Sequence, residues 1–581
     1  MAKFFDCFAG NETFEKLASM SLIANITVYL RTKYYLDGIL LVNIVTVWFA
    51  TCNFAPLAGA YISDAYLGRF RTLILGSLSS FLGMGIMTLT AAFPQLRPPS
   101  CHEETHCKQP QKWQLGFLLM GMGFLAVGAG GIRPCNVAFG ADQFDITTEK
   151  GRAQLESFFN WYYFSFTIAL LVALTGVVYI QSSVSWVLGL AIPTACLALS
   201  IFVFLLGSGI YIYAKPQGSV FLDIAKVIVA AFKKKHLRIR PDSHYSLNDP
   251  PPKGSDPATA KLPHTNRFTV LDKAAVIADP DELNNEGMPK NSWRLCSVQQ
   301  VEQLKCLISI LPVWLSGITC FTVMDQQNTF GVLQAIQMNT SIGRHFKIPP
   351  GWMGISGMIA LSIWILIYER LYIPYARKRT NKDVRLTLQQ RIRTGIVFSI
   401  LCMLVAGVVE KQRRDTASKH RSFASPMSVA WLLPQFVLSG MTEAFAAVAI
   451  MEFLTKQLAE RMRTVAGAIF FLSIAIASYI SSLCVNVVHL VSQRGGGSAW
   501  LGGHDLNKNR LDYYYYIIAA LGALNFIYFT FFASRYLPTS SSSDENGDGK
   551  GGIIESLMPP HATKASEDIS EQKELDMRVR G

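Results

Sequence analysis

Charged residues are scarce in this sequence. Only 16% of the 581 residues are Asp, Glu, Lys or Arg, against roughly 25% in ordinary soluble domains. Half of the residues are hydrophobic, the mean hydropathy is +0.28, and the apolar residues stand in long uninterrupted blocks. Because a block of about 20 apolar residues crosses a bilayer as a helix, the composition excludes an ordinary soluble protein and predicts a multi-pass membrane protein.

The sequence also lacks the marks of several function classes. It contains no nucleophile–base pair, no phosphate-binding loop and no standard metal-site spacing, so we expect no enzyme activity, no cofactor and no metal. The net charge of +13 gathers beside the apolar blocks, where it indicates topology and lipid contact rather than nucleic-acid binding. No small-residue cleavage site follows the first apolar block, so the first helix is predicted to act as its own insertion signal.

Twelve membrane helices are predicted, in two groups of six. The first group is 14–33, 39–62, 71–93, 113–135, 157–180 and 185–213, and the second is 300–337, 352–375, 391–410, 428–455, 463–492 and 512–536. The stretch 300–337 is too long for a simple span, and a break is expected near Asp325 to Asn328. The expected fold is therefore all-α, with an N-terminal bundle over 1–213 and a C-terminal bundle over 299–537.

The remaining segments are polar. Residues 214–298 are predicted to be a cytoplasmic linker, and 538–581 a disordered cytoplasmic tail. Within the linker, Phe221 to Lys235 is amphipathic and ends in three lysines. This segment is predicted to lie on the cytoplasmic membrane face, or alternatively to be a solvated helix end.

The placement of Lys and Arg predicts that both termini are cytoplasmic. The connections then assigned inside carry Arg69, Arg71, Lys150, Arg152, Lys233 to Lys235, the basic residues between Arg370 and Arg393, Lys456, Arg461 and Arg463. One connection, 411–421, is assigned outside although it carries five basic residues. This exception weakens the rule, but the inverted topology would place many more charges outside.

Two features lie in connections assigned outside. Asn339 begins an Asn-Thr-Ser glycosylation sequon. Cys101 and Cys107 lie in the connection between the third and fourth helices, and the sequence leaves open whether they form a disulfide. Together with His102 and His106 they also present four zinc-type ligands, but the spacing matches no standard zinc site.

Ionisable residues inside spans are costly and therefore indicate function. Glu12, Glu15 and Lys16 share one face of the first helix and can form a proton-sensitive group, although acids at a helix start are also ordinary. Arg133 ends a glycine-rich helix, where the alternative is a cation that reaches the membrane edge. Glu443 lies mid-span and requires a cation or a proton, for which Arg133 is the candidate partner.

Asp325 is the fourth such residue and is followed by Gln326, Gln327 and Asn328. These polar groups are predicted to line an aqueous cavity, because lipid cannot satisfy them. The alternative is a helix break near the outer surface. Carboxylates and cations from both halves near the midplane are typical of an alternating-access carrier, in which protonation releases a salt bridge and lets the halves move.

Several motifs then resemble one family. The segments are GAYISDAYLGR at Gly59 to Arg69, GGIRPC at Gly130 to Cys135, FGADQF at Phe139 to Phe144, FFNWYYF at Phe158 to Phe164, Glu452-Phe453 and Met462-Arg463-Thr464. They resemble the proton-coupled oligopeptide transporters of the major facilitator superfamily, and in particular the plant nitrate transporter/peptide transporter family. The resemblance is closest to the branch that includes nitrate and glucosinolate carriers.

The resemblance implies roles for individual residues. The family's first-helix motif falls on Glu12, Glu15 and Lys16 and implies proton coupling. Its fourth-helix cation, usually lysine, falls on Arg133, and its tenth-helix glutamate falls on Glu443. Its regulatory threonine falls on Thr72.

The departures from the family bear on the substrate. Met324 stands where the dual-affinity nitrate member has a histidine, so nitrate binding by that route is in doubt. The tyrosines of peptide carriers after the first-helix motif are absent, which makes a peptide substrate unexpected. Asp325 replaces a small residue and is expected to modify gating or substrate charge. We expect Arg133, Met324, Asp325, Gln327 and Glu443 to face the substrate.

The sequence thus predicts a proton-coupled symporter of a small polar or anionic solute. The two candidate solutes are nitrate and a glycosylated specialised metabolite, such as a glucosinolate or iridoid glucoside. The alternative functions are a nutrient receptor and an uncoupled anion channel. The expected partners are protons, the solute and the lipid bilayer, and the protein is expected to be a monomer or weak dimer. The expected location is the plasma membrane, or alternatively the vacuolar membrane.

Overall fold

Long helices make up most of the computed structural model, which describes residues 2–99, 108–144, 148–213, 220–236, 246–249, 262, 264–265, 267–284, 289–343, 346–380, 385–458, 463–494 and 499–537. Side chains of the first helix are described from Thr13 onward. The helices of the N-terminal bundle are α1 (Ala2–Lys33), α2 (Gly38–Ile62), α3 (Arg69–Ala92), α4 (Lys112–Ala141), α5 (Glu149–Val172) and α6 (Trp186–Leu206).

The C-terminal bundle contains α9 (Val298–Gln326), α10 (Val332–Ile336), α11 (Met353–Ile367), α12 (Ile373–Thr380), α13 (Leu388–His420), α14 (Leu433–Thr442), α15 (Val448–Gln457), α16 (Arg463–Arg494) and α17 (Leu511–Phe531). Short π-helical segments join several of them: η7 (Gln327–Gly331) lies between α9 and α10, and η11 (Glu443–Ala447) between α14 and α15. The predicted break in the seventh span is therefore a loosened turn rather than an interruption.

Helix starts follow local capping chemistry. At α9, the Ser297 hydroxyl accepts a hydrogen bond from the Gln300 backbone N–H, and the Gln300 side chain accepts one from Ser297 N. Thr387 and Gln390 form the same reciprocal pair at α13. Such capping boxes satisfy backbone donors that would otherwise lack partners in the first turn. Each of these two helices therefore begins with two of its backbone donors satisfied by side chains.

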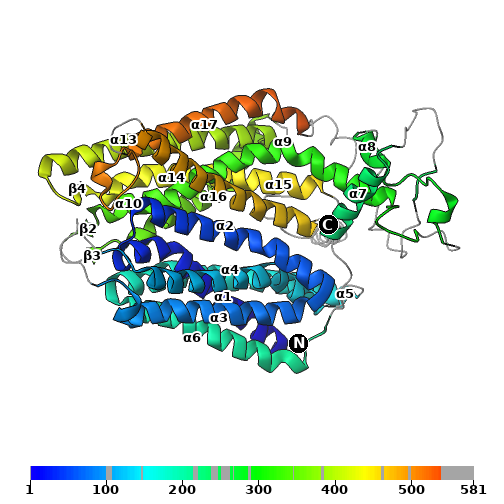
Figure 1. Cartoon of the computed structure of the whole chain (residues 1–581), viewed down its shortest axis with the longest axis horizontal. Helices are drawn as coiled ribbons and strands as arrows, with labels where there is room; N and C mark the ends of the chain where they lie inside the picture. Colours follow the sequence, from blue (N-terminus) through cyan, green and yellow to red (C-terminus); the bar gives the residue numbers. More distant parts are fainter. Residues whose placement is uncertain are drawn as a thin grey trace, which may run out of the picture.

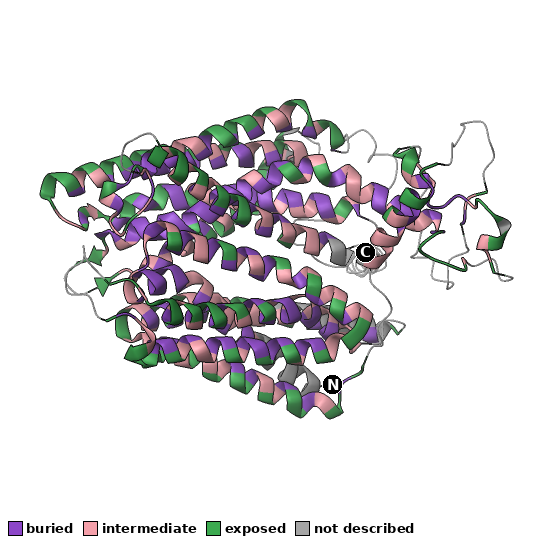
Figure 2. Cartoon of the chain, viewed as in Figure 1, coloured by how far each residue is buried: buried purple, intermediate pink, exposed green. Residues whose placement is uncertain are grey.

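Eleven helical segments of the described chain are long and apolar enough to cross a membrane. The helix α1 is not among the eleven, but it packs within the N-terminal bundle against α5 and α6. Its first half carries the charged residues of the Glu15 region. The helices lie side by side in two layers, with exposed apolar residues on the outer faces of the bundles (Figures 1 and 2), as expected for surfaces that face lipid.

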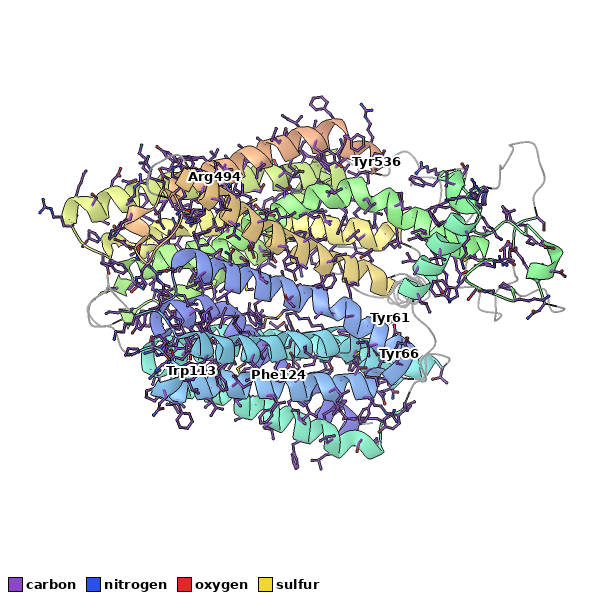
Figure 3. All side chains as sticks on the ribbon, in the orientation of Figure 1. Tyr61, Tyr66, Trp113, Phe124, Arg494 and Tyr536 are labelled. Atoms are coloured by element: carbon purple, nitrogen blue, oxygen red, sulfur yellow. The ribbon has the colours of Figure 1, made fainter. Side chains whose placement is uncertain are left out.

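The two ends of the molecule differ in content. One end, here the linker end, carries α7 (Val220–Lys233) and α8 (Thr269–Asp272). The opposite end, here the far end, carries the short strands β1 (Met338–Asn339), β2 (Ser341–Ile342), β3 (Phe346–Lys347) and β4 (Ser425–Ser428). The strand β1 pairs in parallel with β4, and β2 pairs antiparallel with β3. In Figure 3, Trp113 and Arg494 mark the far end, and Tyr61, Tyr66 and Tyr536 mark the linker end.

The amphipathic linker helix α7 packs on protein with part of its apolar surface. Val227, Ala230 and Ala231 are buried against Ala274 and Ala275 of the linker and residues at the start of α9. Lys234 donates to Glu282 Oε2 at 2.8 Å, which anchors the helix further. The linker and α9 therefore cover one part of the apolar surface of α7, whereas Ile228 and Phe232 remain exposed. That this helix lies on the cytoplasmic membrane face stays a prediction.

The segment 411–421 is mostly helical and not the loop that the sequence suggested. The helix α13 continues to His420. Arg413 is completely buried and pairs with Glu410, and Arg414 pairs with Asp512 at 2.7 Å. Since acids neutralise these two arginines, the segment contributes less positive charge than its composition indicates. The exception to the charge rule is thereby reduced.

Candidate functional site: a charged cavity in the N-terminal bundle

Glu15 and Arg133 line the same cavity between helices of the N-terminal bundle. The cavity has a volume of about 40 Å³, which is room for a few water molecules. The other residues that line it are Ala18, Ser19, Leu22, Ile23, Trp48, Cys52, Ser80, Met84, Leu125, Ala129 and Leu197. An acid and a cation therefore share a small, mostly apolar cavity, where their electrostatic interactions are stronger than in water.

Glu15 and Lys16 form an ion pair on α1. Lys16 Nζ lies 3.2 Å from Glu15 Oε2, and the two side chains are 13% and 11% exposed. Within the described residues, Glu15 Oε2 accepts no hydrogen bond of good geometry. The side chain of Glu12, the third residue of the predicted group, lies outside the described residues.

Close helix packing positions Arg133. A Cβ on Gly59 of α2 would lie 1.8 Å from the carbonyl oxygen of Gly130, so only glycine permits this crossing of α2 and α4. Arg133, one turn further along α4, then reaches α2, where its Nη1 donates to Asn53 Oδ1 at 2.7 Å and to Cys52 O at 3.2 Å. Both acceptors are neutral, so the charge of the guanidinium remains available to a carboxylate or an anionic solute.

Glu443 lies on the other bundle, in the π-helical segment η11, and is half-buried. No hydrogen bond or ion pair joins it to Arg133 in the described part of the chain. The structure therefore brings Glu15, Lys16 and Arg133 together but does not bring Glu443 to them. The expected meeting of charges from both halves is absent from this conformation.

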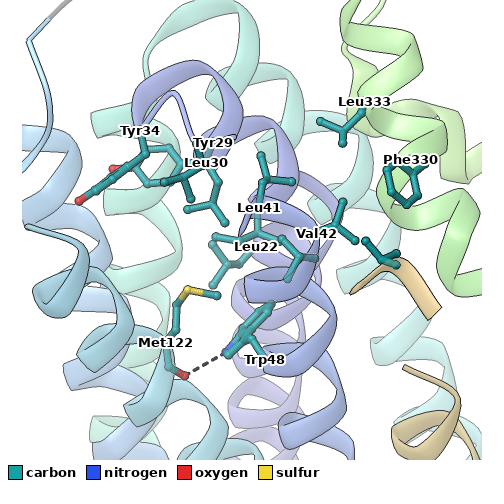
Figure 4. Packing of buried hydrophobic residues seen from close by; sticks show 14 of the residues in the cluster. Leu22, Tyr29, Leu30, Tyr34, Leu41, Val42, Trp48, Met122, Phe330 and Leu333 are labelled. Carbon is teal, nitrogen blue, oxygen red and sulfur yellow. Dashed lines mark hydrogen bonds between the residues drawn. The ribbon is translucent and has the colours of Figure 1, made fainter. Parts of the chain in front are cut away.

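The two bundles meet at the far end of the molecule. One apolar cluster there contains Leu41 and Val42 of α2 together with Phe330, Leu333 and Val485 of the C-terminal bundle (Figure 4). In the same figure, Trp48 Nε1 donates to Met122 O at 2.9 Å, which ties α2 to α4. The described apolar clusters nearer the linker end each belong to one bundle or to the linker region. The conformation is thus closed at the far end.

Polar bonds reinforce this closure. Asn43 Nδ2 on α2 donates to Asn486 Oδ1 on α16 at 2.9 Å, and Ser482 Oγ donates to Asn43 Oδ1 at 2.7 Å. The backbone N–H of Gly38 donates to Gly503 O at 3.0 Å. These bonds cross from one bundle to the other. They must break if the far end opens.

The predicted substrate residues of the seventh span point into the C-terminal bundle. Asp325 is buried, and its Oδ1 accepts from Ser478 Oγ on α16 at 3.0 Å. Gln327 Oε1 accepts from Gln435 Nε2 on α14 at 2.9 Å. Met324 packs against the apolar cluster around Phe321. None of these three lines the charged cavity, and their contact with substrate stays a prediction.

A buried polar network, which the sequence did not reveal, runs from Gln327 toward the far end. Gln435 Nε2 also donates to Gln334 Oε1 at 3.0 Å, and Gln334 Nε2 donates to Glu410 Oε2 at 2.8 Å. Glu410 then accepts two bonds of 2.8 Å from Arg413. The i, i+3 spacing of Glu410 and Arg413 indicated the final ion pair. Nothing in the sequence indicated that Gln327, Gln435 and Gln334 bond to one another.

Sequence comparison assigns the family. The profile described as POT family matches residues 70–501, which is most of the chain. The chain belongs to the POT family. Among curated Arabidopsis thaliana proteins, it is 57% identical to Protein NRT1/ PTR FAMILY 2.8 over 91% of this chain and 94% of that one. It is 45% identical to Protein NRT1/ PTR FAMILY 2.13, over 91% and 85%.

Solved structures of POT family transporters share the fold. PepTSo aligns with a TM-score of 0.65 at 17% identity, over 92% of this chain and 98% of that one. An auto-inhibited POT family peptide transporter aligns with a TM-score of 0.66 at 18% identity, over 95% and 99%. The predicted major facilitator fold is confirmed. The chain is a multi-pass membrane transporter and not an enzyme.

The remaining predicted sites of this POT family member are placed as follows. Thr72 is buried, and its hydroxyl donates to Gly68 O at 3.0 Å, so a kinase could reach it only after local opening. Asn339 is exposed at the far end, where its Oδ1 accepts from Ser341 N at 3.0 Å. Cys101, His102, His106 and Cys107 lie outside the described residues.

Proposed function

We propose that this POT family member is a proton-coupled symporter of a small polar or anionic solute. Its termini and linker face the cytoplasm, and the far end faces the compartment outside the membrane, with the plasma membrane as location and the vacuolar membrane as the alternative. The observation that carries the proposal is that Glu15, paired with Lys16, shares one cavity with Arg133. That cavity combines a proton acceptor with a cation able to hold an anion.

The geometry supports a sequence of events. A proton that binds Glu15 removes the negative charge opposite Lys16, which leaves Lys16 and Arg133 as an excess of positive charge in the cavity. That excess attracts an anionic or strongly polar solute from the side that is open. When the bundles move, Glu443 can approach Arg133 from the C-terminal half and compete for the guanidinium, which favours release of the solute. Each step requires only proton transfer or exchange of ion partners.

The choice of solute rests on the seventh span. Met324 offers no N–H or O–H donor to a nitrate oxygen, whereas Asp325 and the neighbouring glutamines are able to bond sugar hydroxyls once α9 exposes them. This chemistry favours the glycoside over nitrate. Thr72 is proposed as a phosphorylation site and the protein as a monomer or weak dimer. These assignments follow from the family resemblance.

Uptake in oocytes tests the proposal. In cells that express the protein, we expect saturable uptake of a glycoside or nitrate, accompanied by an inward current. Both the uptake and the current should increase at acidic external pH. The Glu15→Gln variant should reach the surface but lose pH-driven uptake, by roughly 100-fold or more, because it cannot exchange a proton. The matched control is Asp415→Asn, which removes one exposed carboxylate on α13 and should transport normally.

The rival functions give different results. A receptor would bind a solute without flux, and an uncoupled channel would give currents that neither saturate nor depend on pH. Full pH-driven uptake by Glu15→Gln would refute proton coupling at this residue. Uptake of nitrate together with rejection of every glycoside would refute the preference for a glycoside as solute.

A further inference from the structure

His504 lies at the junction of the two bundles at the far end and takes no part in the charged cavity. It belongs to the connection between α16 and α17, one residue after Gly503, whose carbonyl accepts from Gly38 of the other bundle. The imidazole lies between Tyr35 of the N-terminal bundle, with ring centroids 6.5 Å apart, and Phe423 of the C-terminal bundle, 5.9 Å away and stacked. It therefore fills a space that both bundles enclose.

Both ring nitrogens of His504 are covered and have no hydrogen-bond partner among the described residues. A buried neutral imidazole tolerates this arrangement at some cost, but an imidazolium carries two charged N–H donors that would go unsatisfied. Among the described residues, no carboxylate is bonded to the ring. Closure of the junction therefore favours the neutral ring.

The charged groups around the ring reinforce this restriction. Arg31 of α1 is buried and repels a charge on His504. Asp37 and Asp505 interact with Arg31, and Asp505 also accepts from Asn507 N at 2.9 Å, so both acids are already engaged.

The backbone has a positive φ on each side of the junction. Tyr35 has a φ of 52°, in the left-handed region that residues other than glycine rarely adopt. Gly503, directly before His504, has a φ of 72°. For Gly503 this conformation is ordinary, whereas for Tyr35 it persists only where the surroundings enforce it. The turn at Tyr35 is therefore held in place by its neighbours in the closed junction.

We propose that His504 is a proton-sensing plug, which seals the far end when its ring is neutral and favours opening when it gains a proton from the compartment on that side. The proposal rests on the proposed function for the direction in which the far end faces. The plug releases its proton to the same side when the junction closes again. It therefore regulates access to the carrier and adds nothing to the protons carried across the membrane.

The acid–base properties of the ring agree with this mechanism. Burial, together with the charge of Arg31, lowers the pKa of His504 to about 4 in the closed junction. A hydrated ring in the open junction would have the ordinary pKa of about 6.5. Because the open form has the higher pKa, acid stabilises it. The ratio of open to closed forms should rise roughly 25-fold between about pH 7.5 and about pH 5.

Labelling of a cysteine at the junction tests the proposal without any transport. Val42 is completely buried in the apolar cluster that joins the bundles, and Val42→Cys nearly conserves its volume. A membrane-impermeant thiol reagent should modify this cysteine only while the far end is open. With His504 present, its labelling should increase at acidic pH after normalisation to the unfolded protein, which removes the pH dependence of the thiol itself.

Three changes at the plug complete the test. His504→Gln, with His504→Asn as a second neutral variant, should abolish most of the acid-induced increase. His504→Arg should give high labelling at both pH values, because its charge is permanent. His420→Gln is the matched control, since His420 is exposed at the far end of α13, and it should keep the full increase. The protein without Val42→Cys gives the background from native cysteines.

The outcomes separate this inference from the proposed function. An acid-induced increase in labelling that survives in both neutral variants would overturn the plug. High labelling at both pH values in the neutral and charged variants alike would also overturn it, because His504 would then have only a packing role. Absence of labelling at every pH would overturn it as well. Loss of solute uptake in the wild-type protein would instead contradict the symporter and leave the labelling result standing.

Discussion

The N-terminal cavity and the C-terminal polar network treat buried charge in opposite ways. In the cavity, Arg133 bonds only to neutral acceptors and Glu15 has an incomplete set of donors. In the network, Glu410 and Arg413 are fully buried and neutralise each other through two bonds. The first arrangement leaves charge available for a proton or solute, and the second uses it to hold helices together.

This difference separates function from structure within one membrane protein. A charge in a span is costly wherever it lies, so cost alone does not identify a functional site. The partners decide: a charge with unused capacity can respond to a ligand, whereas a saturated ion pair cannot. On this criterion we expect the moving parts of the carrier in the N-terminal bundle and at the junction, and we expect the far-end half of the C-terminal bundle to be a rigid support.

The largest effect that sharpens the comparison is expected at Arg413. Arg413→Met should destabilise the protein by about 3–5 kcal/mol, because it leaves the carboxylate of Glu410 buried without a cation. The measurement is the thermal unfolding temperature of the purified protein in detergent, together with its surface expression.

Arg133, the corresponding arginine of the cavity, supplies the control. Arg133→Met should lose solute uptake but unfold close to the wild-type temperature, because no buried carboxylate depends on it in this conformation. Adding Glu410→Gln to Arg413→Met should recover part of the stability. If Arg133→Met proves as unstable as Arg413→Met, the two regions do not differ as described.

A smaller effect is expected in the middle of the network. Gln435→Leu removes the donor shared by Gln327 and Gln334 and should cost about 1–3 kcal/mol, the usual penalty for buried polar groups left without a partner. The control Gln412→Leu changes an exposed glutamine on α13 and should be nearly neutral. Unchanged unfolding temperature in Gln435→Leu would mean that water replaces the lost bonds.

Particular residues show how far the sequence could lead. Apolar blocks predicted the helices to within a few residues in most cases, because length and hydropathy suffice to specify a span. The position of Arg133 on a tight glycine crossing was also predictable from residues 121–131. The end of α13 was missed because basic residues were assigned to water, whereas Arg413 is buried against Glu410. Pairing is decided by tertiary packing, which periodicity does not contain.

The same limit applies to the predicted substrate residues. Asp325 and Gln327 were expected to face water because lipid cannot satisfy them. The sequence could not show that Ser478 of α16 and Gln435 of α14 satisfy them instead, since those partners lie more than 100 residues away. His504 drew no attention at all, because a lone histidine in a polar connection is ordinary until its neighbours from the other bundle are known.

The smallest expected effect concerns the junction between the two regions. Asn43→Ala removes the bonds to Asn486 and Ser482 and should favour the open far end by about 1 kcal/mol, or roughly fivefold. Labelling of Val42→Cys at fixed neutral pH measures that ratio. The control Thr322→Ala removes a bond to Ile318 O within α9 and should leave labelling unchanged. If Asn43→Ala changes the unfolding temperature but not the labelling, its bonds stabilise both conformations equally, and closure of the far end must then depend on the apolar cluster around Val42.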